Sequence, residues 1–595
     1  MARKTNLARC TVAMAATAVV AGTLTGTSSA TPSSSAAGRY IVVARSSGDL
    51  AALQAKAVKS GAHVVRSIHQ LNTMVVEGPA AVRTSLSADS RALEVAADHV
   101  ESIAPAERRK PNLAAPGLFG ARTVAGSTAN PATAGGGVHA DPAFHYKGLL
   151  WDYRRMGLPQ GWQTTQGSPA ITVGVADTGI DFTHYDLASK VDKVVDFTQT
   201  ENPPICKTYY GFSDRDLARK YGGPEKGDWN GHGSWIAGNI GAALNGKGTN
   251  GIAPNVRLVA LKISQWCGSA YDSELINSFV TAADMNIDVV NISFGGFLDR
   301  SNADENRIYR LYERAVDYAK SRGTAIVASA GNNHVEIGYG GRVLSHGSLT
   351  TPGTARADFT DLYGLYEVPG GINGVIDVSA TGNVVVPSSR NCPPGTIGTA
   401  EDANATCKPR SDRHQAAGSG EENQLAYYSN YGSRIDIAGP GGARKFNLPN
   451  YDRGGTPGFP YTSADLTNVY EAFSTTSNWA LEIPCFTFTR GSGFPQGQCY
   501  TAIQGTSMSA PHVAAAYALV ASAHKDLRGN VDRISNRLIR TATDERNYTR
   551  ALSATDKSPG DLYGDRCVTG YCHLTGARIP DWAAYGAGLV NVARP

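Results

Sequence analysis

The 595-residue sequence lacks several features that would assign it to other protein classes. No apolar run reaches the roughly twenty residues that a membrane-spanning helix needs, so we expect no membrane anchor. Charged residues make up only 18%, and the net charge of +4 comes without long basic runs. This pattern gives no indication of binding to nucleic acid or to a membrane surface. No Cys-x-x-Cys pair occurs, which argues against a structural zinc site.

Residues 1–30 have the pattern of a signal peptide. A positively charged start is followed by a short apolar stretch at 12–21 and by small residues up to Ala30. We therefore expect secretion and an extracellular location. Removal of this segment takes Cys10 with it and leaves an even number of cysteines, which in an exported chain indicates disulfides.

The spacing of the remaining cysteines suggests a pairing, although sequence alone does not fix the connectivity. Three pairs would close short loops and would leave the fourth pair to each other. Free buried thiols are the alternative. The expected pairs are Cys392 with Cys407, Cys485 with Cys499, Cys567 with Cys572, and Cys206 with Cys267.

The segment Gly-Thr-Ser-Met-Ser-Ala-Pro-His at 505–512 places Ser507 between a glycine turn and an apolar helix. We expect Thr506 or Ser507 to cap that helix. Backbone N–H groups and the positive end of the helix dipole would stabilise negative charge on a substrate carbonyl oxygen. Ser507 is therefore a candidate nucleophile. By itself, the tripeptide is far more typical of an ordinary capped helix.

Three other segments offer partners for this serine. Asp177 ends an expected buried strand at 171–177. His232 lies between two glycines at the start of a helix of small residues, where it could act as a general base. Asn332 follows another apolar strand and could donate to an oxyanion. Sequence neighbours of the same types, Asp181, Asp186, His184 and Asn333, are rivals for these roles.

Taken together, these motifs resemble those of the subtilisin-like serine peptidases, the subtilase family. They are Val-Ala-Asp177-Thr-Gly, Gly-His232-Gly-Ser, Ala-Gly-Asn332 and Gly-Thr-Ser507-Met-Ser-Ala-Pro, in the family's order. The resemblance extends over about residues 151–591. It implies that Ser507 is the nucleophile, His232 the general acid/base and Asp177 the residue that holds the imidazole. Asn332, with the Ser507 backbone N–H, would form the oxyanion hole.

The resemblance also implies a substrate groove. Ser293, Phe294 and Gly295 match the family segment that pairs with an extended peptide, and Ala330 with Gly331 would form one wall of the primary specificity pocket. Because main-chain pairing is indifferent to peptide sequence, we expect broad specificity. Near His184 the family usually has a proline where this chain has Tyr185, which should alter the loop and leave the chemistry unchanged.

Long insertions could narrow access to this groove. They run over about 333–371, 387–422 and 443–504. A secreted serine endopeptidase is the function that we expect, and a tripeptidyl-type exopeptidase of the same fold stays open as the alternative. A sedolisin-type acid peptidase would use a glutamate base and an aspartate at the oxyanion, which His232 and Asn332 argue against. An inactive binding protein would normally have lost a triad residue.

The N-terminal part is expected to be a separate α+β unit at 38–106, followed by a linker at 107–150 that contains the processing region. Expected strands at 39–44, 63–68 and 72–77 alternate with helices at 49–60 and 80–87. This unit resembles the inhibitory propeptide of subtilases, which makes it an intramolecular partner of the enzyme.

The peptidase domain, 151–595, is predicted to be α/β, with a doubly wound parallel sheet covered by helices on both faces and the site at the carboxyl ends of the strands. We expect strands at 171–177, 256–263, 287–293, 324–328 and 375–380, and helices at 273–285, 305–321 and 507–521.

The chemistry implied by the resemblance needs no cofactor. A structural calcium ion is conceivable near Asp186 and residues 244–248, where the family often binds one, although Lys247 adds a positive charge there. Peptides or proteins are the expected substrates, and the enzyme is expected to be monomeric.

Overall fold

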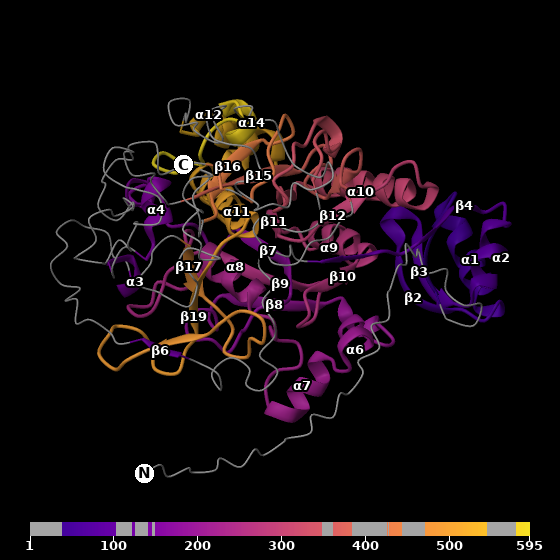
Figure 1. Cartoon of the computed structure of the whole chain (residues 1–595), viewed down its shortest axis with the longest axis horizontal. Helices are drawn as coiled ribbons and strands as arrows, with labels where there is room; N and C mark the ends of the chain where they lie inside the picture. The colour runs from indigo at the N-terminus through magenta and orange to yellow at the C-terminus, as the bar shows by residue number, and fades with distance from the viewer. Residues whose placement is uncertain are drawn as a thin grey trace, which may run out of the picture.

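The computed structural model describes residues 38–102, 122–124, 141–145, 149–347, 361–382, 425–426, 428–442, 471–543 and 579–595. Figure 1 shows a large α/β body and, beside helices α9 and α10, a small N-terminal unit in indigo. The expected signal peptide and most of the expected linker lie outside the described residues. No helix among those residues is long and apolar enough to cross a membrane.

A seven-stranded parallel sheet forms the centre of the large body, in the order β16-β15-β13-β11-β7-β9-β8. The predicted parallel sheet is thereby confirmed. The two edge strands were not predicted from the sequence, because β8 is half-exposed and polar, and β16 is short and rich in small residues. The strands are β7 (Thr172–Asp177), β8 (Val191–Asp196), β9 (Arg257–Lys262), β11 (Val289–Ile292), β13 (Ala325–Ser329), β15 (Ile376–Thr381) and β16 (Ile437–Pro440).

Helices cover both faces of this sheet, as expected for a doubly wound fold. On one face, α8 (His232–Gly241) and α11 (Thr506–Ala523) share a hydrophobic core with Val173 and Val175 of β7. On the other face, α9 (Asp272–Asp284) and α10 (Ala303–Ser321) pack with Val290 and Ile292 of β11. The alternating side chains of the strands thus supply two separate cores.

The N-terminal unit is a four-stranded antiparallel sheet, in the order β2-β3-β1-β4, with two helices. Tyr40 and Val42 of β1 face its own helices, whereas Ile41 and Val43 belong to the same core as α9 and α10. The unit therefore uses one face of its sheet to pack on the large body. Its elements are β1 (Gly38–Ala44), α1 (Ser47–Lys59), β2 (His63–Ile68), β3 (Thr73–Gly78), α2 (Ala80–Ser87) and β4 (Ala92–Ala97).

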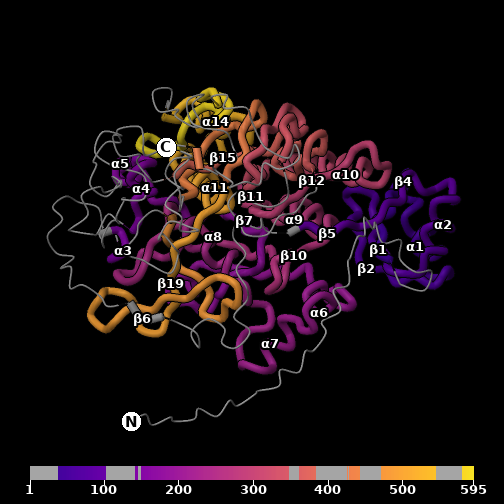
Figure 2. The backbone as a smooth tube through the Cα atoms, viewed as in Figure 1, coloured from indigo at the N-terminus to yellow at the C-terminus, as the bar shows by residue number. Residues whose placement is uncertain are grey.

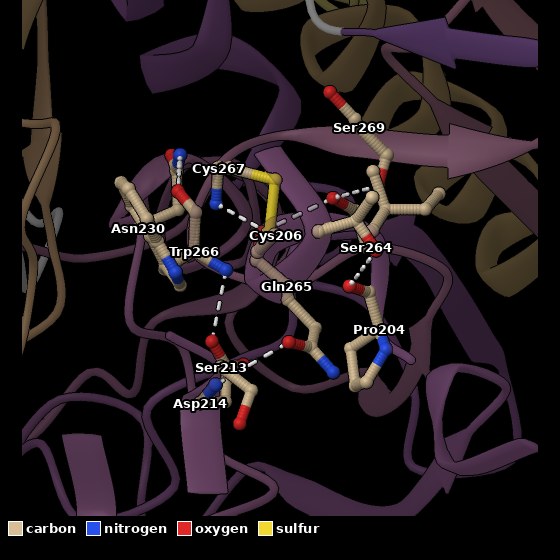
Figure 3. Close-up of a disulfide and its surroundings, with 12 residues drawn as sticks. Pro204, Cys206, Ser213, Asp214, Asn230, Ser264, Gln265, Trp266, Cys267 and Ser269 are labelled. Atoms are coloured by element: carbon tan, nitrogen blue, oxygen red, sulfur yellow. Dashed lines mark hydrogen bonds between the residues drawn. A yellow bond between two sulfur atoms is a disulfide. The ribbon is translucent and has the colours of Figure 1, made fainter. Parts of the chain in front are cut away.

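A short strand continues the unit into the large body. After β4, β5 (Val100–Ser102) pairs antiparallel with β10 (Ser269–Tyr271), and Figure 2 shows the two strands side by side near α9. A disulfide between Cys206 and Cys267 fixes the loop just before β10, where Ser264 Oγ donates to the Ser269 carbonyl at 2.8 Å (Figure 3).

A second sheet of the large body, β17-β19-β18-β6, takes β17, β18 and β19 from the segment that precedes α11 and β6 from residues 122–124. It contains the disulfide between Cys485 and Cys499, so two of the four expected pairs are confirmed. The other two pairs lie outside the described residues. The strands are β6 (Arg122–Val124), β17 (Ala472–Thr475), β18 (Phe486–Phe488) and β19 (Tyr500–Ile503).

Shorter elements complete the described parts of the chain. They are α3 (Pro142–His145), α4 (Trp151–Arg155), α5 (Leu158–Gly161), α6 (Ile205–Tyr210), α7 (Asp214–Tyr221), β12 (Gly296–Leu298), β14 (Tyr366–Val368), α12 (Val531–Thr541) and α14 (Asp581–Tyr585).

Candidate active site

Asp177 and His232 meet at the carboxyl edge of the central sheet. Asp177 is the last residue of β7 and His232 the first residue of α8, and both are fully buried. The His232 Nδ1 atom lies 2.8 Å from Asp177 Oδ1, which also accepts a hydrogen bond from the Thr178 N–H. A proton held on Nδ1 by this carboxylate leaves Nε2 as the basic nitrogen of a neutral ring. This is the orientation that a general base requires.

The glycines around His232 allow this close approach. Gly231 has a φ of 105°, a left-handed conformation that other residues rarely adopt. A Cβ on Gly233 would lie 3.1 Å from the Asp177 Cβ and would collide with the Gly179 carbonyl oxygen. The Gly-His-Gly sequence is therefore what lets the helix start against the end of β7.

Asp228, which the sequence reasoning missed, organises the turn before His232. Its carboxylate accepts hydrogen bonds from the backbone N–H groups of Asn230, Gly231 and Ser234 and from two hydroxyl groups, one of them that of Thr178. Asp228 is fully buried. An aspartate two residues before an Asn-Gly pair is a turn signal that could have identified it.

Lys262 was also missed, although a lysine inside the apolar strand β9 is itself a signal. Its buried ammonium group donates to the Thr178 carbonyl at 2.5 Å and to the Gly227 carbonyl at 3.0 Å. It also forms an ion pair with Asp214 at 2.8 Å. Lys262 thus connects the turn after Asp177 with the turn that holds His232.

Ser507 approaches the same place from α11. Its Oγ lies 3.4 Å from the Ser293 carbonyl oxygen, and Ser293 Oγ donates to the Ser507 carbonyl at 3.1 Å. The next residue, Phe294, packs its ring edge-to-face with His232, with 6.5 Å between the ring centroids. Ser507 and His232 therefore border one short segment, 293–294, of the expected substrate groove.

Asn332 lies beside the start of α11. Its side-chain carbonyl accepts from the Thr506 N–H at 2.9 Å and from Thr506 Oγ1 at 2.8 Å, which fixes the amide plane. The expectation that Thr506 or Ser507 caps the helix is wrong, because Gly505 occupies the N-cap position and no side chain caps the helix there. The Thr506 hydroxyl positions Asn332 instead.

Asn430, another residue that the sequence reasoning missed, supports the wall formed by 330–333. Its Oδ1 accepts from the Asn333 and Val335 N–H groups, and its Nδ2 donates to the Ala330 carbonyl at 2.7 Å. Gly331 has a φ of 92°, and a Cβ there would lie 2.6 Å from that Nδ2. An asparagine before Tyr-Gly is a turn signal, but sequence alone does not show what it touches.

His184 and Asp181, two of the rival candidates, make contacts that support the fold. His184 is buried beside Thr475 and the Cys499 carbonyl, and burial lowers its pKa to about 3. Asp181 accepts from Thr183 and from the Asn478 N–H, which fixes its loop. Burial raises the pKa of Asp177 as well, while the adjacent His232 acts in the opposite direction. Of the candidate carboxylates, only Asp177 contacts His232.

The region considered for calcium contains two carboxylates. Asp186 lies against residues 244–248, as expected, and Asp141 joins it by accepting from the Asn245 and Gly246 N–H groups. Burial raises the pKa of Asp186 to about 8 and that of Asp141 to about 6. Asp186 Oδ1 is buried without a hydrogen-bond partner. Oxygen donors of this kind suit calcium, although no group of three His, Cys, Asp or Glu residues suited to a metal occurs in the described ranges.

A doubly wound sheet with an aspartate, a histidine and a serine gathered at its carboxyl edge is the architecture of a class of serine hydrolases. Residues 168–560 match the model of the subtilase family, and the chain belongs to that family. The predicted resemblance to the subtilase family is thus confirmed.

Among curated proteins, the chain is similar to subtilisin DY of Bacillus licheniformis, with 25% identity over 63% of this chain and 84% of the relative. The thermophilic serine proteinase of Bacillus sp. (strain AK1) is 30% identical over 32% of this chain. The chain spans 40% of that relative and 53% of thermitase from Thermoactinomyces vulgaris.

Among solved structures, the epidermin leader peptide processing serine protease (EpiP) of Staphylococcus aureus has the same fold. Its TM-score is 0.55 and its sequence identity 17%, over 94% of this chain and 98% of that one. The likeness confirms the α/β subtilisin-like fold.

Proposed function

We propose that the protein is a secreted, monomeric serine endopeptidase that hydrolyses peptide bonds through an acyl-enzyme. Ser507 is the nucleophile, His232 the general acid/base and Asp177 the residue that orients the imidazole. Asn332 and the Ser507 N–H form the oxyanion hole. The observation that carries this proposal is the buried 2.8 Å contact between His232 and Asp177, together with Ser507 in the first turn of α11.

In this mechanism, His232 removes the Ser507 proton as the hydroxyl attacks the scissile carbonyl. The Asn332 amide, held by Thr506, donates to the oxyanion, as does the Ser507 N–H at the helix start. His232 then protonates the leaving amine and later activates water, while Asp177 keeps the ring in one tautomer. Since His232 must be neutral to accept a proton, activity should be highest at neutral to alkaline pH.

The N-terminal unit is proposed to act as an inhibitory propeptide, with processing within 107–150. Its β5 strand pairs with β10, as an extended substrate would. Several ion pairs cross the same interface, including Arg39 and Arg66 with Glu274, and Arg83 with Asp304. A unit bound in this way blocks part of the groove until it is removed.

Casein hydrolysis tests the activity, and mass spectrometry of the products tests the mode of cleavage. Internal cleavages are expected from an endopeptidase, whereas release of tripeptides from one end would favour the exopeptidase alternative. A rate maximum near pH 4 would instead favour an acid peptidase. Full hydrolysis by a pure Ser507→Ala protein would contradict the proposed nucleophile, and no hydrolysis by the wild type would favour an inactive binding protein.

A further inference from the structure

Glu101 of β5 lies beside β10, at the expected substrate groove. On β5, Glu101 pairs with Ala270 of β10, and Val100 pairs with Tyr271. Since side chains alternate along a strand, Glu101 projects to the same side of the pair as Ala270. When the N-terminal unit leaves, β10 becomes an unpaired edge, and an extended peptide can take the place of β5.

The carboxylate of Glu101 reaches the substrate segment. A Cβ on Gly296 would collide with both Glu101 carboxylate oxygens, so the acidic group lies directly on the Gly296 backbone. Gly296 follows Ser293 and Phe294, which contact Ser507 and His232. The Glu101 side chain therefore marks a pocket in the same groove as the candidate catalytic residues.

Two further carboxyl groups, those of Asp272 and Glu305, lie near Glu101. Asp272, the first residue of α9, is fully buried, and its Oδ1 accepts from the Tyr312 hydroxyl at 2.6 Å. Its Oδ2 is buried and has no hydrogen-bond partner within the described parts of the chain. Glu305 of α10 adds a third carboxyl group close enough to act electrostatically on both Glu101 and Asp272.

No cation among the described residues pairs with these three groups. The interface arginines Arg39 and Arg66 pair with other carboxylates such as Glu274, and both belong to the N-terminal unit. Burial and the nearby Glu305 raise the pKa of Glu101 to about 7, and burial with Glu101 raises that of Asp272. Glu101 thus fits this place best when it is protonated.

We propose that the pocket beside Gly296, now filled by Glu101, binds a lysine or arginine side chain of the substrate at one fixed position upstream of the scissile bond. A cation supplies the partner that Asp272 Oδ2 lacks, and it is attracted by Glu305 as well. An apolar side chain would leave the Asp272 carboxylate buried without a partner, and an acidic one would have to bring a proton. This inference rests on the proposed function.

The test uses the mature wild-type enzyme and a peptide library, read by mass spectrometry. Lysine or arginine should be enriched at a single upstream position, and the ratio of the two shows which the pocket prefers. For paired peptides, kcat/KM should be about tenfold higher with lysine than with leucine at that position. Equal rates for the two peptides would overturn the proposal while leaving the peptidase activity established.

Asp272→Asn should remove this preference by lowering kcat/KM for the lysine peptide about tenfold and leaving the leucine peptide nearly unchanged. Asp284→Asn is the matched control, because it removes the same charge from the other end of α9. Retention of the lysine preference in Asp272→Asn would contradict the assignment of Asp272.

A second test does not depend on catalysis or on the folding of Asp272→Asn. In the full chain with Ser507→Ala, a Glu101→Lys substitution places the cation on β5 itself. Thermal unfolding at pH 7.5 should occur at a higher temperature than in a Glu101→Leu chain. An equal or lower unfolding temperature for the lysine variant would overturn the pocket assignment, even if the wild type proved to have no peptidase activity.

Discussion

Two buried aspartates, Asp177 at the end of β7 and Asp272 at the start of α9, have different surroundings. Asp177 Oδ1 has His232 and the Thr178 N–H as partners, whereas Asp177 Oδ2 is buried without a hydrogen-bond partner among the described residues. Asp272 Oδ1 has one tyrosine hydroxyl as partner and its Oδ2 likewise has none, but here burial and the nearby carboxyl groups of Glu101 and Glu305 all raise the pKa of the aspartate. The basic partner of Asp177, His232, belongs to the large body itself. No basic side chain in the described ranges pairs with Asp272, so such a partner would have to come from what occupies the groove.

We call Asp177 and its partners the fixed centre, and Asp272 with its neighbours Glu101 and Glu305 the exchangeable centre. Around Asp177, the supporting contacts from Asp228 and Lys262 come from the peptidase domain itself. Around Asp272, the occupant Glu101 comes from a unit that packs on the outside of α9 and α10 (Figure 1). Charges that are satisfied internally favour a rigid site, whereas an unsatisfied carboxylate in a pocket favours recognition of a ligand.

The largest expected effect is that of Ser507→Ala at the fixed centre. We expect kcat to fall by about 10⁶, which is the size known for subtilisin itself and is not inferred from this structure. Ser509→Ala, two residues further along α11, is the control and should retain most of the activity. Steady-state hydrolysis of a peptide substrate measures both. Comparable losses in the two variants would mean that the helix start, and not the Ser507 hydroxyl, is what matters.

A smaller but still large effect is expected from Asp228→Ala, which tests whether the fixed centre depends on its internal partners. The substitution leaves several buried N–H and O–H donors without an acceptor and should destabilise the protein by about 3 kcal/mol. Because Asp228 positions His232 without touching substrate, kcat should fall more than KM changes. Thermal unfolding and a kcat/KM series measure the two effects. An unchanged kcat would contradict the positioning role.

The exchangeable centre should respond to pH. The folded pKa of Glu101 is raised from 4.5 to about 7, so its stabilising contribution is complete below pH 4.5 and is lost as the pH rises through 7. The groups that face it are Asp272, Glu305 and, through Asp272, Tyr312. In a full chain with Ser507→Ala, hydrogen exchange at β5 and β10 should therefore be slower at pH 5 than at pH 8.

Glu101→Gln is the test variant for that measurement, because glutamine has nearly the same shape as glutamate and does not titrate. The difference in exchange between pH 5 and pH 8, corrected for the intrinsic rate, should shrink in this variant. Asp49→Asn is the control. Asp49 lies at the start of α1, on the face of the N-terminal sheet that points away from the large body, so this substitution should leave the difference unchanged. An undiminished pH effect in Glu101→Gln would assign it to another group.

The sequence predicted the fixed centre far better than the exchangeable one. Asp177, His232 and Ser507 stand in short motifs in which glycines and strand ends determine the local geometry. The central strands and helices were also predicted to within a few residues. Asp228 and Asn430 act through hydrogen bonds to backbone groups, and a sequence shows only their tendency to form turns. The Glu101 pocket depends on contacts between residues far apart in the chain, which no local pattern contains.

The smallest expected effect concerns calcium, which would supply a positive partner to another pair of buried carboxylates, Asp141 and Asp186. Asp186 and Asp141 have raised pKa values, and Asp186 Oδ1 has no hydrogen-bond partner. If calcium binds the folded chain there, excess calcium at about 100 times its Kd should add roughly 2.7 kcal/mol of stability, visible as a higher unfolding temperature than in chelator. Asp186→Asn should abolish most of that shift, whereas Asp181→Asn, in a loop whose hydrogen bonds already hold it, should preserve it. The same unfolding temperature in calcium and in chelator would mean that no calcium binds there and that these two aspartates are stabilised as neutral acids. They would then resemble Asp272, whose pKa is also raised by burial and which also has no basic partner in the part of the chain that the structure describes.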